Sequence, residues 1–165
     1  MPEPGQPLLD ADQAAFICGA VSICASSSRA NGLPDLARAT GVRVSEDRAT
    51  VTVLFASTPG AAVLDDVRRN GRIAVVFTEP GSHRTIQLKG DDACIVSVES
   101  GDAALAVRYA EAFASCLVRL GYDKELGLTL LACDPEDLVA VRFSVAAGFS
   151  QTPGPNAGEP LRSVP

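Results

Sequence analysis

The chain has 165 residues, of which 47% are hydrophobic, so it is long enough to bury a core and too apolar for an intrinsically disordered protein. Its formal net charge of -6, without a long stripe of lysine and arginine, argues against a nucleic-acid-binding protein. No apolar run approaches the roughly 20 residues of a membrane span, and the start lacks a secretory signal pattern, so we expect no membrane partner and a cytoplasmic location.

The first part of the chain predicts a flexible start, a short helix and two strands. Residues 1–9 are rich in proline and glycine, and we expect them to be flexible. Asp10 or Asp12 can cap a helix that runs through Ile17. Strands are expected over 19–26 and 34–44, with a turn over 28–32 in which Asn31-Gly32 is the strongest hairpin signal of the chain.

The middle of the chain carries the clearest pattern, in which a strand, a helix and a second strand follow one another. Residues 49–55 alternate valine with threonine and leucine, which predicts a strand. The sequence from Ser57 to Gly60 breaks that strand and opens a helix, which Asn70-Gly71 ends. The apolar run 72–77 then predicts a buried strand.

The last part predicts a long strand, a long helix and two short strands. The long strand is expected over 84–98, with a bend near Lys89-Gly90, and the long helix over 101–120. The short strands are expected over 128–132 and 138–143, with a tight turn at 134–137 between them. From Phe149 onward the sequence has no periodicity. We expect residues 150–165 to be a flexible tail or one that docks on a partner, with its prolines lowering the entropy cost of ordering.

The order of these elements favours one domain over residues 1–165 that is mainly β with helices, in the α+β class. Several strands come first, a long helix follows, and further strands return. That order suits an antiparallel barrel with flanking helices better than alternating βαβ units.

Cysteine and histidine usage argues against a metal site. None of the five cysteines forms a C-x-x-C pair, and we interpret them as reduced thiols. The chain has one histidine, His83, which argues against a histidine-rich metal site and a Ser-His-Asp triad. His83 stays a candidate for a single axial ligand or a proton carrier.

The region 49–90 resembles the pyridoxamine 5′-phosphate oxidase-like superfamily of FMN-binding split barrels. The matching segments are the strand 51–55, the linker 56–60, the helix up to Asn70-Gly71, the strand 72–77 and the segment 83–90. The resemblance implies a split antiparallel β-barrel flanked by helices, a homodimer with ligand sites at its interface, and FMN as the redox cofactor.

The resemblance also implies where the cofactor lies. In the oxidases, an Arg-Lys pair at the start of the short helix holds the FMN phosphate, and Ala62 and Val63 match those positions here. Ser57 and Thr58 can replace them through their hydroxyls and the free amides of the helix start, although both also suit a helix N-cap. The other cofactor-binding candidates are Arg38, Arg43, Arg84, Thr85, Gln87, Lys89 and Gln151.

Two functions stay open at this point. The first is an FMN-dependent oxidoreductase with an unknown small-molecule substrate. The Arg-x-His segment that the oxidases use on pyridoxal phosphates has no match here, so we expect a different activity. The second is a protein without catalysis that binds a flavin, a deazaflavin or haem, and the missing Arg-Lys pair favours it more than the resemblance alone does.

Overall fold

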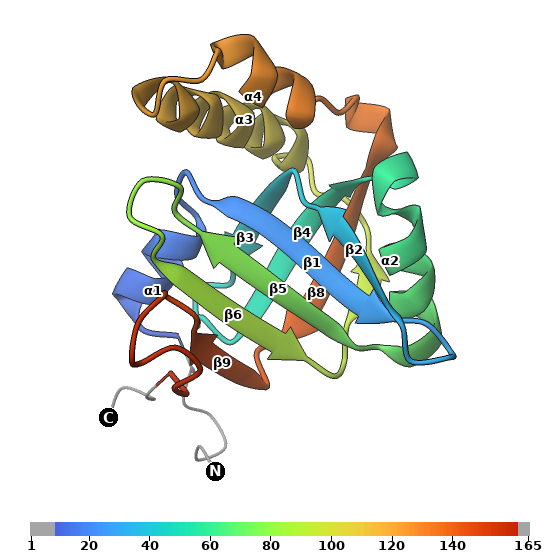
Figure 1. Cartoon of the computed structure of the whole chain (residues 1–165). Coiled ribbons are helices and arrows are strands. Elements are labelled where there is room, and N and C mark those ends of the chain that lie inside the picture. The colour runs from blue at the N-terminus through green and yellow to red at the C-terminus, as the bar shows by residue number, and fades with distance from the viewer. Residues whose placement is uncertain (1–8, 162–165) are drawn as a thin grey trace.

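Two antiparallel sheets and the helices around them make up residues 9–161, the part of the chain that the computed structural model describes (Figure 1). Expectations for residues 1–8 and 162–165 lie outside the described residues. The five-stranded sheet has the order β2 (Pro34–Arg38), β1 (Ser22–Ser28), β5 (Ile73–Thr78), β6 (Thr85–Gly90) and β9 (Ala147–Ser150). The four-stranded sheet has the order β3 (Gly41–Val44), β4 (Thr50–Ala56), β8 (Leu138–Ser144) and β7 (Cys94–Val96).

The first helix, α1 (Ala11–Ile17), begins as predicted. The side chain of Asp10 accepts a hydrogen bond from the backbone N–H of Gln13, and the Gln13 side chain accepts one from the N–H of Asp10. This reciprocal capping box satisfies two amides that a helix start leaves without partners. Leu9, which we expected in the flexible start, is fully buried in the core.

The predicted strand over 34–44 is wrong as one element, because the chain changes sheets at Ala39 and Thr40. The N–H of Ala39 donates to Ile23 in the five-stranded sheet, and the N–H of Thr40 donates to Leu54 in the four-stranded one. Both residues are buried. Nothing in the local sequence marks this exchange, since the residues on either side remain extended.

The predicted strand over 84–98 is likewise two strands in different sheets. β6 ends at Gly90 and β7 begins at Cys94, and the N–H of Ala93 donates to the carbonyl of Gly71 across the connection. The bend expected near Lys89-Gly90 is therefore another crossing between the two sheets. These crossings join the sheets into the split barrel.

Helix α2 (Ser57–Asn70) confirms the prediction for this segment. Gly71 ends it in the left-handed conformation, with φ 66°, and its N–H donates to Val67. A residue without a side chain adopts this conformation at little cost, which explains the glycine. The helix packs Val63, Leu64 and Val67 into the main core.

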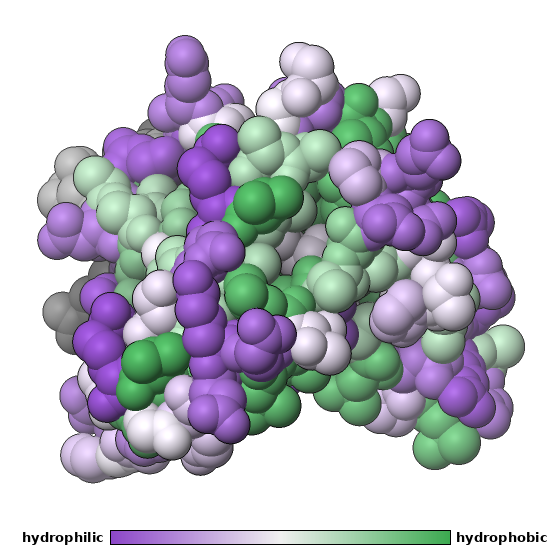
Figure 2. Space-filling view, turned by 90° about the horizontal axis from the view of Figure 1, so that it is seen from above, coloured by the Kyte–Doolittle hydropathy of each residue, from purple (hydrophilic) through white to green (hydrophobic). Residues whose placement is uncertain are grey.

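The predicted short strand over 128–132 is wrong: helix α4 (Lys124–Leu130) occupies most of it and packs on the long helix α3 (Asp102–Arg119). Gly127 explains the close packing of the two helices. A Cβ added there would lie 2.8 Å from the Cα of Ala114. Lys124 of α4 also pairs with Glu111 of α3 at 2.8 Å. The view from above shows hydrophobic side chains among hydrophilic ones (Figure 2).

The start of the C-terminal tail also differs from expectation, because Phe149 and Ser150 belong to β9 at the edge of the five-stranded sheet. Farther along, the N–H of Leu161 donates to Gly148, so the described part of the tail folds back on its own sheet. Docking of the tail on a partner stays a prediction.

The core lies between the two sheets, and its larger cluster contains residues from α1, α2 and both sheets. A smaller cluster of Leu54, Ala106, Leu138 and Ala140 lies between α3 and the other face of the four-stranded sheet. The four-stranded sheet is therefore covered on both faces. The fold is a split antiparallel β-barrel flanked by helices, which confirms the predicted class. Among the helices of residues 9–161, none has the length and apolar character to cross a membrane.

Candidate ligand site

Five of the predicted site residues share the outer face of the five-stranded sheet: Arg38, Thr85, Gln87, Lys89 and Gln151. Along β6, Ile86 and Leu88 point into the core, so the alternating residues of that strand point outward. In Figure 1 no helix of the described chain lies in front of this face. Among residues 9–161, the outer sheet face is therefore the sheet surface left open to a ligand or a second protein.

The register of the strands aligns these side chains in rows across the outer sheet face. In one row Arg38 lies beside Cys24, Cys24 beside Val76, Val76 beside Gln87, and Gln87 beside Phe149. In the next row the order is Leu36, Ser26, Ala74, Lys89 and Ala147. Neighbouring strands are about 4.8 Å apart, so Arg38 and Gln87 in the first row are separated by roughly 14 Å. The smaller side chains of Cys24 and Val76 lie between them.

The polar side chains of the outer sheet face already have partners within the chain. Arg38 donates to the hydroxyl of Ser22 at 2.8 Å. Gln151 donates to the side-chain oxygen of Gln87 at 3.3 Å, so the tail and β6 present their amides together. The ammonium group of Lys89 lies 5.2 Å from the ring centre of Phe149. These contacts orient donors along one face without burying them.

The outer end of β6 is fixed by the tail. The backbone N–H of Thr85 donates to the hydroxyl of Thr152 at 3.0 Å, and the N–H of Gln151 donates back to the carbonyl of Thr85. The Thr85 side chain is buried against the hydroxyl of Thr78. Arg84 lies apart from these residues, with its guanidinium 4.2 Å from the ring centre of Phe16.

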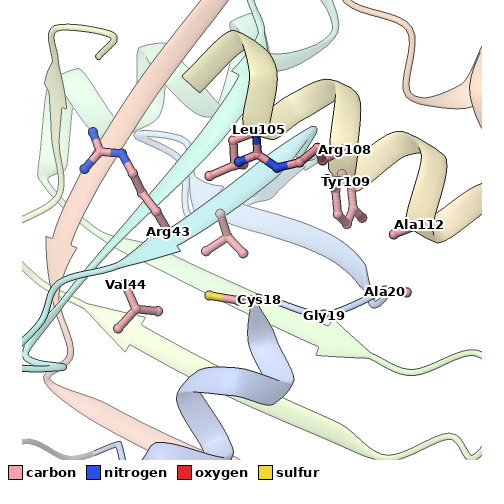
Figure 3. Close-up of a pocket in the computed structure, with 10 residues that line it drawn as sticks. Cys18, Gly19, Ala20, Arg43, Val44, Leu105, Arg108, Tyr109 and Ala112 are labelled. Atoms are coloured by element: carbon pink, nitrogen blue, oxygen red, sulfur yellow. The ribbon is translucent and has the colours of Figure 1, made fainter. Parts of the chain in front are cut away.

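A second feature is a pocket of about 450 Å³ between the end of α1, strand β3 and helix α3 (Figure 3). We call it the α1–α3 pocket. It brings together Arg43, one of the predicted residues, and Arg108, which we did not predict. Its other lining residues are Cys18, Gly19, Ala20, Val42, Val44, Leu105, Tyr109 and Ala112. The volume suits a small-molecule ligand, and the walls are mainly apolar.

Arg43 is held by two carboxylates. Its Nε donates to Oδ1 of Asp102 at 3.0 Å, and an Nη lies 2.9 Å from a carboxylate oxygen of Glu99. Asp102 is only 1% exposed, and its second oxygen accepts the backbone N–H of Glu99 at 2.8 Å. Arg43 therefore links β3 to the start of α3 while it lines the α1–α3 pocket.

Arg108 could have been found from the helical period. Leu105, Arg108, Tyr109 and Ala112 recur at the spacing of one helix face, and all four line the α1–α3 pocket. The sequence predicted the helix over 101–120, but Arg108 was not among the predicted site residues. Arg108 is exposed, and within residues 9–161 it has no ion pair within 4.0 Å.

Two of the titratable groups that line the α1–α3 pocket, Cys18 and Tyr109, have shifted pKa values. Burial raises the pKa of the Cys18 thiol, so this sulfur stays protonated at neutral pH. Burial also raises the pKa of the Tyr109 phenol well above its ordinary range, while nearby Arg38 lowers it in part. The Tyr109 hydroxyl donates to the carbonyl of Val21 at 2.6 Å. Both groups are therefore neutral parts of the wall.

Tyr109 also connects the α1–α3 pocket to the outer sheet face. Its hydroxyl bonds to Val21, the residue before β1, and the next residue, Ser22, accepts the hydrogen bond from Arg38. Arg38 is close enough to act on the phenol electrostatically. The Arg38 end of the row from Arg38 to Gln87 therefore lies beside Tyr109 in the wall of the pocket.

The start of α2 belongs neither to the outer sheet face nor to the α1–α3 pocket. The N-cap is Ala56, without a side-chain hydrogen bond, so the expected capping by Ser57 or Thr58 is wrong. Both hydroxyl residues line a separate pocket of about 250 Å³ together with Asp134 and Asp137, and no lysine or arginine is among its described lining residues. This acidic surrounding does not fit a phosphate.

His83 lies in the turn before β6 with a positive φ of 60°, an unusual conformation for a residue with a side chain. Within residues 9–161 no group of three histidine, cysteine, aspartate or glutamate side chains gathers as metal ligands.

No family model matches the sequence, and a search of curated proteins finds no match. Solved structures do match. HupZ from Group A Streptococcus is 16% identical with a TM-score of 0.55, over 91% of this chain and 99% of that one. A putative pyridoxamine 5′-phosphate oxidase from Lactobacillus delbrueckii is 14% identical with a TM-score of 0.53, over 89% and 96%. An F420 reductase is 11% identical with a TM-score of 0.51, over 90% and 98%. At these identities the likeness establishes the fold.

Proposed function

We propose that this chain, which has the fold of the pyridoxamine 5′-phosphate oxidase-like split barrels, is a homodimeric oxidoreductase that binds a flavin or deazaflavin. The observation that carries the proposal is the row from Arg38 to Gln87 on the outer sheet face. The Arg38 end of this row lies beside the α1–α3 pocket. The names of two structural relatives, an F420 reductase and a putative pyridoxamine 5′-phosphate oxidase, are consistent with this class of cofactor.

The outer sheet face fits the ring system of a flavin. Small side chains at Cys24, Val76 and Ala74 leave room for a flat ring, while Arg38 and Gln87 offer donors to the carbonyl oxygens along its edge. A bound flavin supplies hydride or electron transfer from its ring. The chain supplies orientation, and a cation beside the ring favours negative charge there.

The α1–α3 pocket is the proposed substrate site. Its apolar walls exclude water from a small organic molecule, and Arg108, which has no ion pair within residues 9–161, would hold an anionic group at its rim. We therefore propose a substrate that combines an apolar or aromatic body with a carboxylate or phosphate. Because Cys18 and Tyr109 stay protonated, neither acts as a base at neutral pH.

Flavin binding is tested by titrating the purified protein with riboflavin, FMN and F420 and following fluorescence quenching. Arg38→Ala should weaken binding roughly 10- to 150-fold, because a charge-assisted hydrogen bond contributes about 1.5–3 kcal/mol. Arg119→Ala, at the exposed end of α3, is the matched control and should bind like the unchanged protein.

The possible outcomes separate the competing functions. No quenching at micromolar concentration by any of the three compounds would refute the proposal, and a Soret band with added haem would favour a haem protein. If a flavin binds, bleaching by NADH or NADPH without oxygen distinguishes an oxidoreductase from a protein that only holds the cofactor.

The dimer is tested at Leu36, which lies on the outer sheet face and is 71% exposed. Neighbouring Leu33 is also exposed, so the β1–β2 hairpin presents apolar surface that a second copy would cover. Light scattering should give twice the chain mass of 17.1 kDa. Leu36→Glu should yield monomers with an unchanged far-UV spectrum.

The matched control for the dimer is Leu126→Glu. Leu126 lies on α4, away from the five-stranded sheet, and is 53% exposed, so the substitution introduces the same charge at a comparable exposure. A variant Leu36→Glu that stays dimeric, or a loss of the dimer in Leu126→Glu alone, would place the interface elsewhere.

A further inference from the structure

We infer that the start of α2 excludes the phosphate of a flavin, so that the ligand class of this chain is the ring system without a terminal phosphate at that place. The inference rests on the proposed function. It concerns Ser57 and Thr58, the residues that the sequence offered as replacements for the phosphate-binding pair of the oxidases.

Strand pairing brings an acidic side chain to this helix start. Ala56, the last residue of β4, lies opposite Leu138, the first residue of β8. The next residue along the chain from Ala56 is Ser57, and the residue before Leu138 is Asp137, so the antiparallel register sets these two side by side. Asp134 lines the same pocket. The position of Asp137 beside the helix start therefore follows from the sheet itself.

The helix start also lacks the donors that hold anions elsewhere. Pro59, the third residue of α2, has no N–H. Val63 matches one of the two phosphate-binding cations of the oxidases, but here it is fully buried in the main core. Ala62, the match of the other, is exposed and uncharged. Two amides and two hydroxyls remain, facing carboxylates.

The negative field of the two aspartates is felt by a third group in the same pocket. Burial first, and then Asp137 and Asp134, raise the pKa of the Cys133 thiol. The same charges would repel a phosphate dianion, and each exposed carboxylate within several ångströms lowers its affinity by a factor of a few. Salt screens such interactions between exposed charges.

The experiment compares riboflavin with FMN, which differ only by the phosphate. The unchanged protein should bind FMN more weakly than riboflavin, by up to about tenfold, because each of the two carboxylates lowers the affinity for the phosphate by a factor of a few. The double variant Asp134→Asn with Asp137→Asn should bind FMN about tenfold more tightly and leave riboflavin within about twofold. This gain should shrink between about 20 mM and about 0.5 M salt, because it is electrostatic.

Glu136→Gln is the matched control. Glu136 lies between the two aspartates in the chain and is exposed, but it does not line the pocket, so its neutralisation should leave the preference unchanged. FMN binding at least tenfold tighter than riboflavin in the unchanged protein would overturn the inference, as would a double variant without a gain for FMN. Failure of both flavins to bind would instead refute the proposed function on which the inference rests.

Discussion

Arg43→Leu is expected to lower the free energy of unfolding by about 3–5 kcal/mol, because it leaves the carboxylate of Asp102 buried without its cation. Asp102 is 1% exposed, and its remaining partner would be the backbone N–H of Glu99. The guanidinium neutralises this charge in the native protein and ties β3 to α3. Urea unfolding followed by circular dichroism measures the loss.

Two companion variants identify the cause of that loss. Adding Asp102→Asn to Arg43→Leu removes the orphaned charge and keeps an oxygen for the Glu99 N–H, so it should recover at least about 1 kcal/mol. Glu99→Ala removes only the exposed partner of Arg43 and should cost about 1 kcal/mol or less. If Glu99→Ala costs as much as Arg43→Leu, the buried carboxylate is not the source of the effect.

Gly90→Val is expected to cost about 3 kcal/mol through overpacking. Gly90 faces the core at the end of β6, and a Cβ there would lie 2.5 Å from Cδ2 and 2.8 Å from Cβ of Phe143. Phe143 is 1% exposed, and its Cβ is fixed by the backbone of β8, so rotation of the ring cannot relieve the second contact. Thermal unfolding should show a lower Tm and an unchanged baseline spectrum.

The matched control is Gly81→Val, in the turn before β6. A Cβ added at Gly81 has no neighbour within 4 Å, so this variant tests the same substitution without the core contact. It should change stability by about 0.5 kcal/mol or less. Equal losses at the two positions would show that the penalty comes from losing glycine and not from the contact with Phe143.

The sequence predicted elements that local chemistry determines. The helix cap, which the sequence left open between Asp10 and Asp12, and the helix end at Asn70-Gly71 need only neighbouring residues; the structure places the cap at Asp10 and confirms the end at Gly71. Elements defined by distant contacts were predicted wrongly. The exchange of sheets at Ala39 depends on Ile23 and Leu54, and helix α4 depends on the fit of Gly127 against α3.

The same distinction applies to the candidate site. Gln87 and Lys89 lie on one face because they alternate along one strand, and the sequence shows that parity directly. That Arg38 lies in the same row follows from the pairing of four strands, which the residue types alone do not reveal. Arg108 was missed because an arginine on a helix resembles solvent-exposed surface until a facing strand turns that surface into a pocket.

The two arginines of the α1–α3 pocket differ in how freely they can vary during evolution. Arg43 is tied to Asp102 and Glu99, so exchanging it to suit another ligand would also weaken the fold. Arg108 has no such ion pair among residues 9–161. Divergence of ligand preference within this lineage should therefore accumulate at position 108, while position 43 stays constant even in descendants that have changed their substrate.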